Sequence, residues 1–121
     1  MMVRGVRGAT SVTSDTPAEI LQETKQLLIE MVARNNIELT DIASVFFTTS
    51  PGVVSEFPAK AARQLGWSDI PLLCGHEMAV ENGLDRCIRV MIHWNTDKTQ
   101  SEIQHVYLNE AVKLRPDLVG Q

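Results

Sequence analysis

Apolar and polar residues repeat with two different periods along this chain, and each period predicts one kind of element. Three segments are strand-like because apolar and β-branched residues alternate or run together in them. They are residues 3–12 (VRGVRGATSV), 41–50 (DIASVFFTTS) and 70–78 (IPLLCGHEM). A fourth strand, the longest, is predicted within residues 82–96 (NGLDRCIRVMIHWNT). The turn signal Asn82-Gly83 predicts that the segments around it run antiparallel or return on a short loop.

Helical spacing is strongest in residues 14–36. Thr16, Pro17 and Glu19 supply an N-cap, a proline in the first turn and an acidic residue at the third helical position. Apolar residues then fall on one side of a helix, and these are Ile20, Leu21, Leu27, Leu28, Met31 and Val32. This pattern predicts a long helix covering one face of a sheet.

Two further segments also show a helical pattern. Residues 57–66 predict a short helix between Pro58 and Gly66. Residues 98–114 carry a capping box at Thr99 and Glu102, and an apolar stripe, and so predict a last helix before an irregular tail at 115–121. The stripe consists of Ile103, Val106, Tyr107 and Ala111.

The order of these elements implies one α+β domain over residues 1–121, with helices packed on one face of a mixed sheet. A formal net charge of -4 argues against general affinity for nucleic acid or for an anionic membrane. The first residues have no apolar signal core, so we expect a cytoplasmic protein in which Cys74 and Cys87 are reduced.

The strand at 85–94 raises a chemical question because an arginine lies in the middle of it. Alternation separates an apolar face (Ile88, Val90, Ile92, Trp94) from a mixed face (Cys87, Arg89, Met91, His93). A mixed face is usually a solvated surface. Arg7, Lys60, Arg63 and Arg115 also occupy constrained positions, however, so the sequence predicts that cations converge on a small polyanion.

Other constellations are weaker. Cys74, His76 and Glu77 form too incomplete a ligand set for a metal. His93 and His105 are possible bases, but neither Ser nor Cys lies in a nucleophile-elbow context. Tyr107 is interpreted as a core aromatic residue whose hydroxyl reaches a partner.

Six sequence blocks resemble a known family. They are RGVRGAT (4–10), TKQLL (24–28), FPAKAAR (57–63), CIRVM (87–91), HVYL (105–108) and LRPDL (114–118). In this order and spacing they resemble the monofunctional, trimeric chorismate mutases of the small α+β class. The resemblance implies isomerisation of chorismate to prephenate without metal, cofactor or covalent intermediate, in a homotrimer that forms a pseudo α/β barrel with sites at subunit interfaces.

The resemblance also implies residue roles. Arg89 would lie beside the ether oxygen of the breaking bond, Glu77 and Cys74 at the ring hydroxyl, and Arg7 with Tyr107 at a side-chain carboxylate. Wall residues would be Phe57, Ala59, Lys60, Arg63 and Leu73, some of them from a neighbouring subunit, and Leu114 with Arg115 would belong to a closing C-terminal segment. Leu73 departs from the family pattern, in which a threonine provides a polar wall contact.

Two other functions stay open at this point. One is an imine or enamine deaminase of the same trimeric fold, whose characteristic motifs are not evident here. The other is a non-catalytic module that binds a carboxylate, since similarity of fold does not by itself establish an activity.

Overall fold

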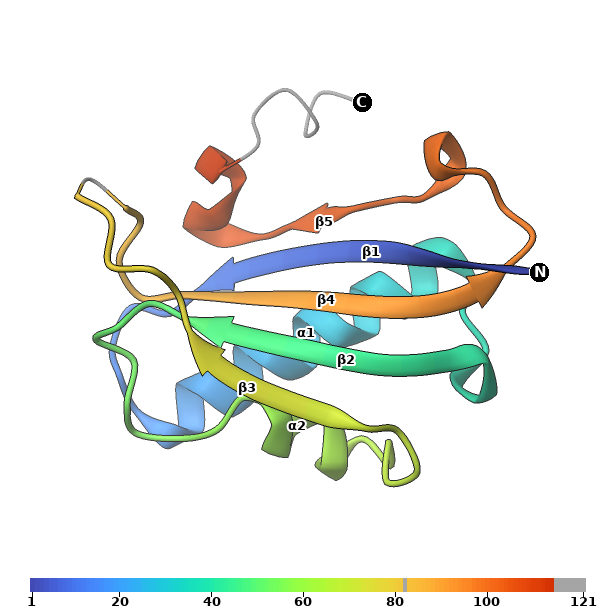
Figure 1. Ribbon diagram of the computed structural model, residues 1–121. Helices are drawn as coiled ribbons and strands as arrows, with labels where there is room; N and C mark the ends of the chain where they lie inside the picture. Colours follow the sequence, from blue (N-terminus) through green and yellow to red (C-terminus); the bar gives the residue numbers. More distant parts are fainter. Residues whose placement is uncertain (82, 115–121) are drawn as a thin grey trace.

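The computed structural model describes residues 1–81 and 83–114. Its main elements are β1 (Met2–Ser11), α1 (Pro17–Asn35), β2 (Ile42–Thr49), α2 (Ala59–Gln64), β3 (Leu72–His76), β4 (Cys87–Thr96) and β5 (Val106–Tyr107). Short 3-10 turns occupy Leu39–Asp41, Gln100–Glu102 and Asn109–Leu114. Figure 1 shows the strands side by side in one sheet with the helices behind it.

The sheet is mixed, as the sequence predicts, and its strand order is β3-β2-β4-β1-β5. β4 is antiparallel to both of its neighbours, β1 and β2, whereas the edge strands β3 and β5 are parallel to theirs. β3 and β4 therefore run in opposite directions, as expected from the turn between them. They are not neighbours, however, because β2 lies between them.

α1 begins and ends where the sequence indicates. The Thr16 hydroxyl accepts a hydrogen bond from the backbone N–H of Glu19 at 3.4 Å, and Pro17 occupies the first turn. The helix ends at Asn36, which takes a left-handed conformation with φ 55°. Such a C-terminal residue satisfies carbonyl groups that the last turn leaves unpaired.

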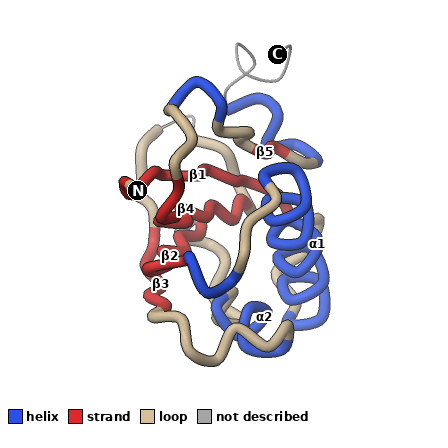
Figure 2. The backbone as a smooth tube through the Cα atoms, turned by 90° about the vertical axis from the view of Figure 1, so that its right-hand side faces the viewer, coloured by secondary structure: helices blue, strands red, loops and turns tan. Residues whose placement is uncertain are grey.

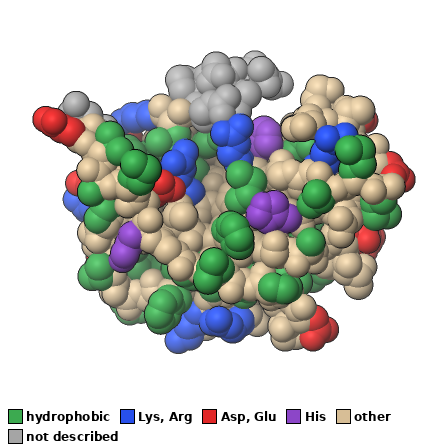
Figure 3. Space-filling model, in the orientation of Figure 1, with side chains coloured by type: hydrophobic (Ala, Val, Ile, Leu, Met, Phe, Trp, Pro, Cys, Tyr) green, Lys and Arg blue, Asp and Glu red, His purple; other side chains and the backbone are tan. Residues whose placement is uncertain are grey.

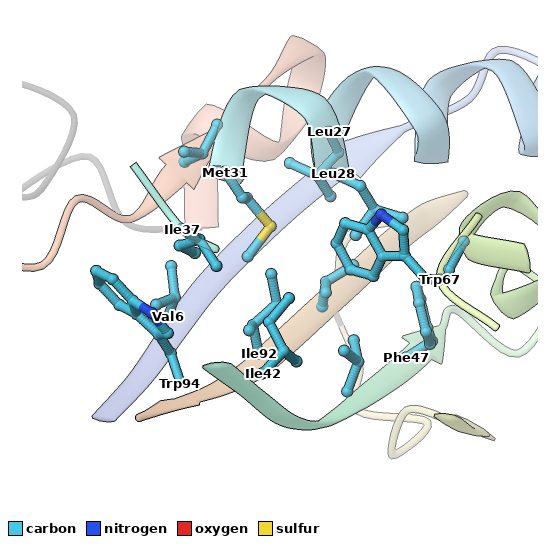
Figure 4. Packing of buried hydrophobic residues seen from close by; sticks show 14 of the residues in the cluster. Val6, Leu27, Leu28, Met31, Ile37, Ile42, Phe47, Trp67, Ile92 and Trp94 are labelled. Atoms are coloured by element: carbon cyan, nitrogen blue, oxygen red, sulfur yellow. The ribbon is translucent and has the colours of Figure 1, made fainter. Parts of the chain in front are cut away.

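The main core lies between α1, α2 and the sheet (Figures 2 and 4). Leu27, Leu28 and Met31 of α1 are fully buried against Val6 of β1 and Ile92 of β4. A Cβ added at Gly8 would lie 2.3 Å from the Met31 sulfur, so the glycine allows helix and sheet to approach closely. Three residues of the apolar face predicted for β4 pack into this core, Val90, Ile92 and Trp94, and the fourth, Ile88, packs in a smaller cluster with Ile20 of α1.

The predicted helix at 98–114 is wrong. The capping box at Thr99 does form, but the helix ends after one 3-10 turn at Glu102, and Val106–Tyr107 instead pair with Gly8 and Ala9 of β1 as β5. The edge of β1 presents backbone groups that need hydrogen bonds, and the late segment supplies them. Its apolar residues are buried, as the stripe indicates, but in two clusters: Ile103 and Val106 belong to the main core, and Tyr107 and Ala111 to a second cluster with Ala9.

Candidate active site

The neighbouring strands β1 and β4 carry basic side chains on the face of the sheet that α1 and α2 leave uncovered (Figure 2). This face is called the open face below. Directly paired residues share a face of an antiparallel sheet. Arg7 pairs with Met91, and Arg89 pairs with Ala9, so both arginines project from this face together with His93. In Figure 3, which shows the open face, basic, histidine and hydrophobic side chains gather over the strands.

Glu77 brings a carboxylate beside Arg89. It follows directly after β3, and its backbone N–H donates to the Thr49 carbonyl at 2.8 Å. Its Oε2 accepts from the Thr48 hydroxyl at 2.5 Å and from Arg89 Nη1 at 3.4 Å. The Arg89 and Glu77 side chains remain 40% and 32% exposed, so the ion pair is open to a ligand.

Tyr107 completes this group from the opposite side. Ala9 lies between Tyr107 and Arg89 in the sheet, because it pairs with both, so all three residues share the open face. Tyr107 is 9% exposed, and its hydroxyl has no hydrogen-bond partner within residues 1–81 and 83–114. A buried hydroxyl in this state is free to bind a polar ligand group.

A cavity of about 420 Å³ joins these groups, and it is lined by Arg7, Thr48, Glu77, Arg89, His93 and Tyr107, among others. A volume of this size accommodates a small organic ligand. A neighbouring cavity of about 550 Å³ shares Glu77 and Arg89 and reaches Leu114. Arg115, the other residue expected to close the site, lies outside the described residues.

The remaining predicted site residues form a second group around α2. Phe57 is 67% exposed, whereas Ala59 is buried, and Lys60 pairs with Glu56 at 3.4 Å. Burial raises the pKa of the Cys74 thiol above its ordinary value, against the opposing effects of the Ala59 backbone and the Arg63 charge. A third cavity, of about 280 Å³, includes Phe57 and Cys74 in its lining.

The structure does not bring these two groups together within one chain. The cavity beside α2 shares no lining residue with the one beside Arg89. Cys74 is close to Glu77 in sequence, but its side chain packs toward the helices. Leu73, in contrast, is 62% exposed and pairs with Phe46, which lines the cavity of Arg89 on the open face.

Thr48 and Phe46 are site residues that sequence reasoning missed. Both line the cavity of about 420 Å³, and the Phe46 ring meets that of His93 edge-on, with centroids 5.3 Å apart. A signal for them was present, because alternation along residues 41–50 puts these two positions on one face of the strand.

Three further properties of the described residues concern metal binding, thiol reactivity and membrane spans. Within residues 1–81 and 83–114, no cluster of three or more His, Cys, Asp or Glu side chains is arranged to hold a metal. Burial raises the pKa of Cys87 to about 11, so this thiol stays protonated at neutral pH. Each described helix is too short or too polar to traverse a lipid bilayer.

Comparison with known sequences shows the class of protein to which this chain belongs. The family model of chorismate mutase type I matches residues 3–118, and the chain belongs to this family. The family indicated by the six sequence blocks is therefore confirmed.

Particular relatives are similar over nearly the whole chain. Chorismate mutase AroH of Thermus thermophilus is 50% identical over 118 residues, which cover 97% of each chain. Chorismate mutase AroH of Bacillus subtilis is 49% identical over 119 residues, or 98% of this chain and 94% of the relative. A solved chorismate mutase from Clostridium thermocellum aligns with a TM-score of 0.88 at 47% identity, covering 89% of this chain and 96% of the other.

Proposed function

We propose that this chain isomerises chorismate to prephenate by a metal-free, non-covalent Claisen rearrangement, in the branch of metabolism that leads to phenylalanine and tyrosine. The observation that carries the proposal is the similarity of this chain to chorismate mutases, at about 50% sequence identity over nearly the full length. Arg7, Arg89, Glu77 and Tyr107 gather around one cavity, and this arrangement suits a small dianion.

Arg89 carries the main catalytic step in this proposal. As the C–O bond breaks, negative charge develops on the ether oxygen, and a cation already in place stabilises the transition state more than the bound substrate. A guanidinium group suits this position because it stays charged and presents donors in a fixed plane. The long β4 strand, paired on both sides, holds the base of the side chain in place.

Glu77, Arg7 and Tyr107 hold the substrate in the compact conformer that brings the two reacting carbons together. Oε2 of Glu77 already accepts from Thr48 and Arg89, which leaves Oε1 to accept from the ring hydroxyl. Arg7 and the unpaired Tyr107 hydroxyl can together bind the side-chain carboxylate. Fixing both ends in advance removes much of the entropic cost of reaching the transition state.

The second group of residues reaches the site from a neighbouring subunit in a homotrimer. The open face carries exposed Phe46 and Leu73, and Phe57 is exposed beside α2, so apolar surface is available for contact between copies. Assembly of three sheets into a pseudo α/β barrel would place the α2 group of one chain at the Arg89 cavity of the next. Lys60 and Arg63 would then add positive charge near the dianion.

The proposal includes a single catalytic domain over residues 1–121 and a cytoplasmic location. The family model spans residues 3–118. Both cysteines are free thiols in the structure, which suits a reducing compartment.

A direct test follows chorismate loss and prephenate formation with purified protein in excess EDTA. We expect turnover well above the rate in buffer. Absence of acceleration would reject the mutase, and release of ammonia from an imine would favour a deaminase. Activity that EDTA abolishes would contradict only the metal-free mechanism.

A further inference from the structure

Glu77 lies where the backbone alone does not fix its carboxylate. It follows the last residue of β3, and residues 78–81 after it are exposed. Its backbone N–H is bound to the Thr49 carbonyl, which fixes the start of the side chain but not the direction of its carboxylate. The direction of the carboxylate therefore depends on the side chains that donate to it.

Thr48 makes the shorter of the two side-chain contacts. Its hydroxyl donates to Oε2 of Glu77 at 2.5 Å, whereas Arg89 Nη1 lies 3.4 Å from the same oxygen. Hydrogen bonds to a charged group are stronger than those between neutral groups. Thr48 is thus the closest anchor of this carboxylate in the described residues.

The sheet fixes Thr48 firmly. β2 is paired on both sides, with β3 and with β4, and Thr48 lies directly opposite Arg89. A β-branched side chain in a strand has few accessible rotamers, so the position of its hydroxyl is well defined. The hydroxyl and the guanidinium consequently approach one carboxylate oxygen from neighbouring strands.

We propose that Thr48 is a positioning residue for catalysis, acting through Glu77. By binding Oε2, its hydroxyl keeps Oε1 toward the cavity for the substrate hydroxyl. It also prevents the carboxylate from turning to form a two-oxygen ion pair with Arg89, an arrangement that guanidinium and carboxylate groups favour. Such a pair would occupy the donors that Arg89 needs for the ether oxygen. This inference rests on the proposed function of the site.

The test compares Thr48→Val with Thr48→Ser. Valine has the shape of threonine without its hydroxyl and suits a strand, whereas serine retains the donor. We expect Thr48→Val to lower kcat roughly tenfold or more with a smaller change in KM, since hydrogen bonds to charged groups have effects of this size. Thr48→Ser should retain activity within about threefold of the unaltered protein, because the same donor reaches Oε2.

Thr24→Val is the matched control. Thr24 lies in α1, is fully buried, and has a hydroxyl without a hydrogen-bond partner in residues 1–81 and 83–114. The same chemical change there should leave turnover unaltered. Thermal melting of all variants separates loss of folding from loss of catalysis, and Thr48→Ala provides a second hydroxyl-free variant if valine disturbs packing.

A double-mutant cycle with Glu77→Gln gives the decisive readout. If Thr48 acts through the Glu77 carboxylate, Thr48→Val should have little further effect on kcat once the carboxylate is absent. An undiminished effect in the Glu77→Gln background, equal losses in Thr48→Val and Thr48→Ser, or normal kcat in Thr48→Val would each overturn the inference. An unaltered protein that does not turn over chorismate would instead overturn the proposed function.

Discussion

Arg7 and Arg89 both line the cavity on the open face, and strand pairing determines where their side chains point. Arg7 and Arg89 share a face because the register of β1 and β4 follows from alternating apolar positions. The place of Cys74 was harder to predict, since it lies in β3 three positions before Glu77 and its side chain packs toward the helices. The partner of Glu77, Thr48, could not be found without the register of β2 against β4.

Arg89→Lys is expected to lower kcat on the order of 100-fold or more, with a smaller change in KM, because the guanidinium contact strengthens in the transition state. Lysine keeps the charge but lacks the planar set of donors. Steady-state kinetics with chorismate measures the effect, and thermal melting checks that the fold is retained. Equal changes in kcat and KM, or no change, would assign Arg89 a binding or structural role.

Among the helices and strands, local sequence signals were sufficient to predict α1 and the long strands. They were insufficient to predict the structure of residues 98–114. A capping box and a spacing of three to four residues at Ile103, Val106 and Tyr107 are compatible with a helix. The outcome was decided by the free edge of β1, almost a hundred residues earlier in the sequence, as the contact between the Arg7 N–H and His105 Nδ1 illustrates. A pattern within one segment carries no information about that edge.

Gly8→Ala is expected to destabilise the protein by about 1–3 kcal/mol, because the new methyl group would overlap Met31 and press on Leu27 where α1 meets β1. Movement of the flexible Met31 side chain relieves part of the overlap. Urea unfolding at equal protein concentration measures the change. Gly75→Ala is the control, since a methyl group at Gly75 would meet no atom within 4 Å; equal stability of the two variants would contradict the close approach.

Across the whole chain, the predicted site residues fall into two groups that line separate cavities, and the proposed homotrimer would bring the two groups together from neighbouring copies. The sheet order places β3, beside α2, at the edge opposite β5, which carries Tyr107. Residue patterns alone indicated only the basic members of the two groups. Their other members, and the sharing of a site between two chains, were implied by the family resemblance.

Mixing two inactive variants tests this sharing. Arg89→Ala removes a residue of the group that lines the cavity on the open face, and Arg63→Ala removes a residue of the group around α2. A site formed between one chain of each variant can therefore contain both an intact Arg89 and an intact Arg63. After the two variants are unfolded and refolded together, random cyclic assembly should restore about a quarter of the sites. Measured activity near the sum of the separate variants would place the whole site within one chain.

The pairing of β5 with β1 also has a consequence for biosynthesis. The N-terminal strand lies between two partners, β4 and β5, that are both translated late, so most of its hydrogen bonds must wait for the second half of the chain. Contacts so distant in sequence slow folding and leave strand edges exposed in the meantime. A nascent chain still lacking β5 has Arg7 and Arg89 but no Tyr107, so the proposed substrate pocket can form only after residue 107 has been translated.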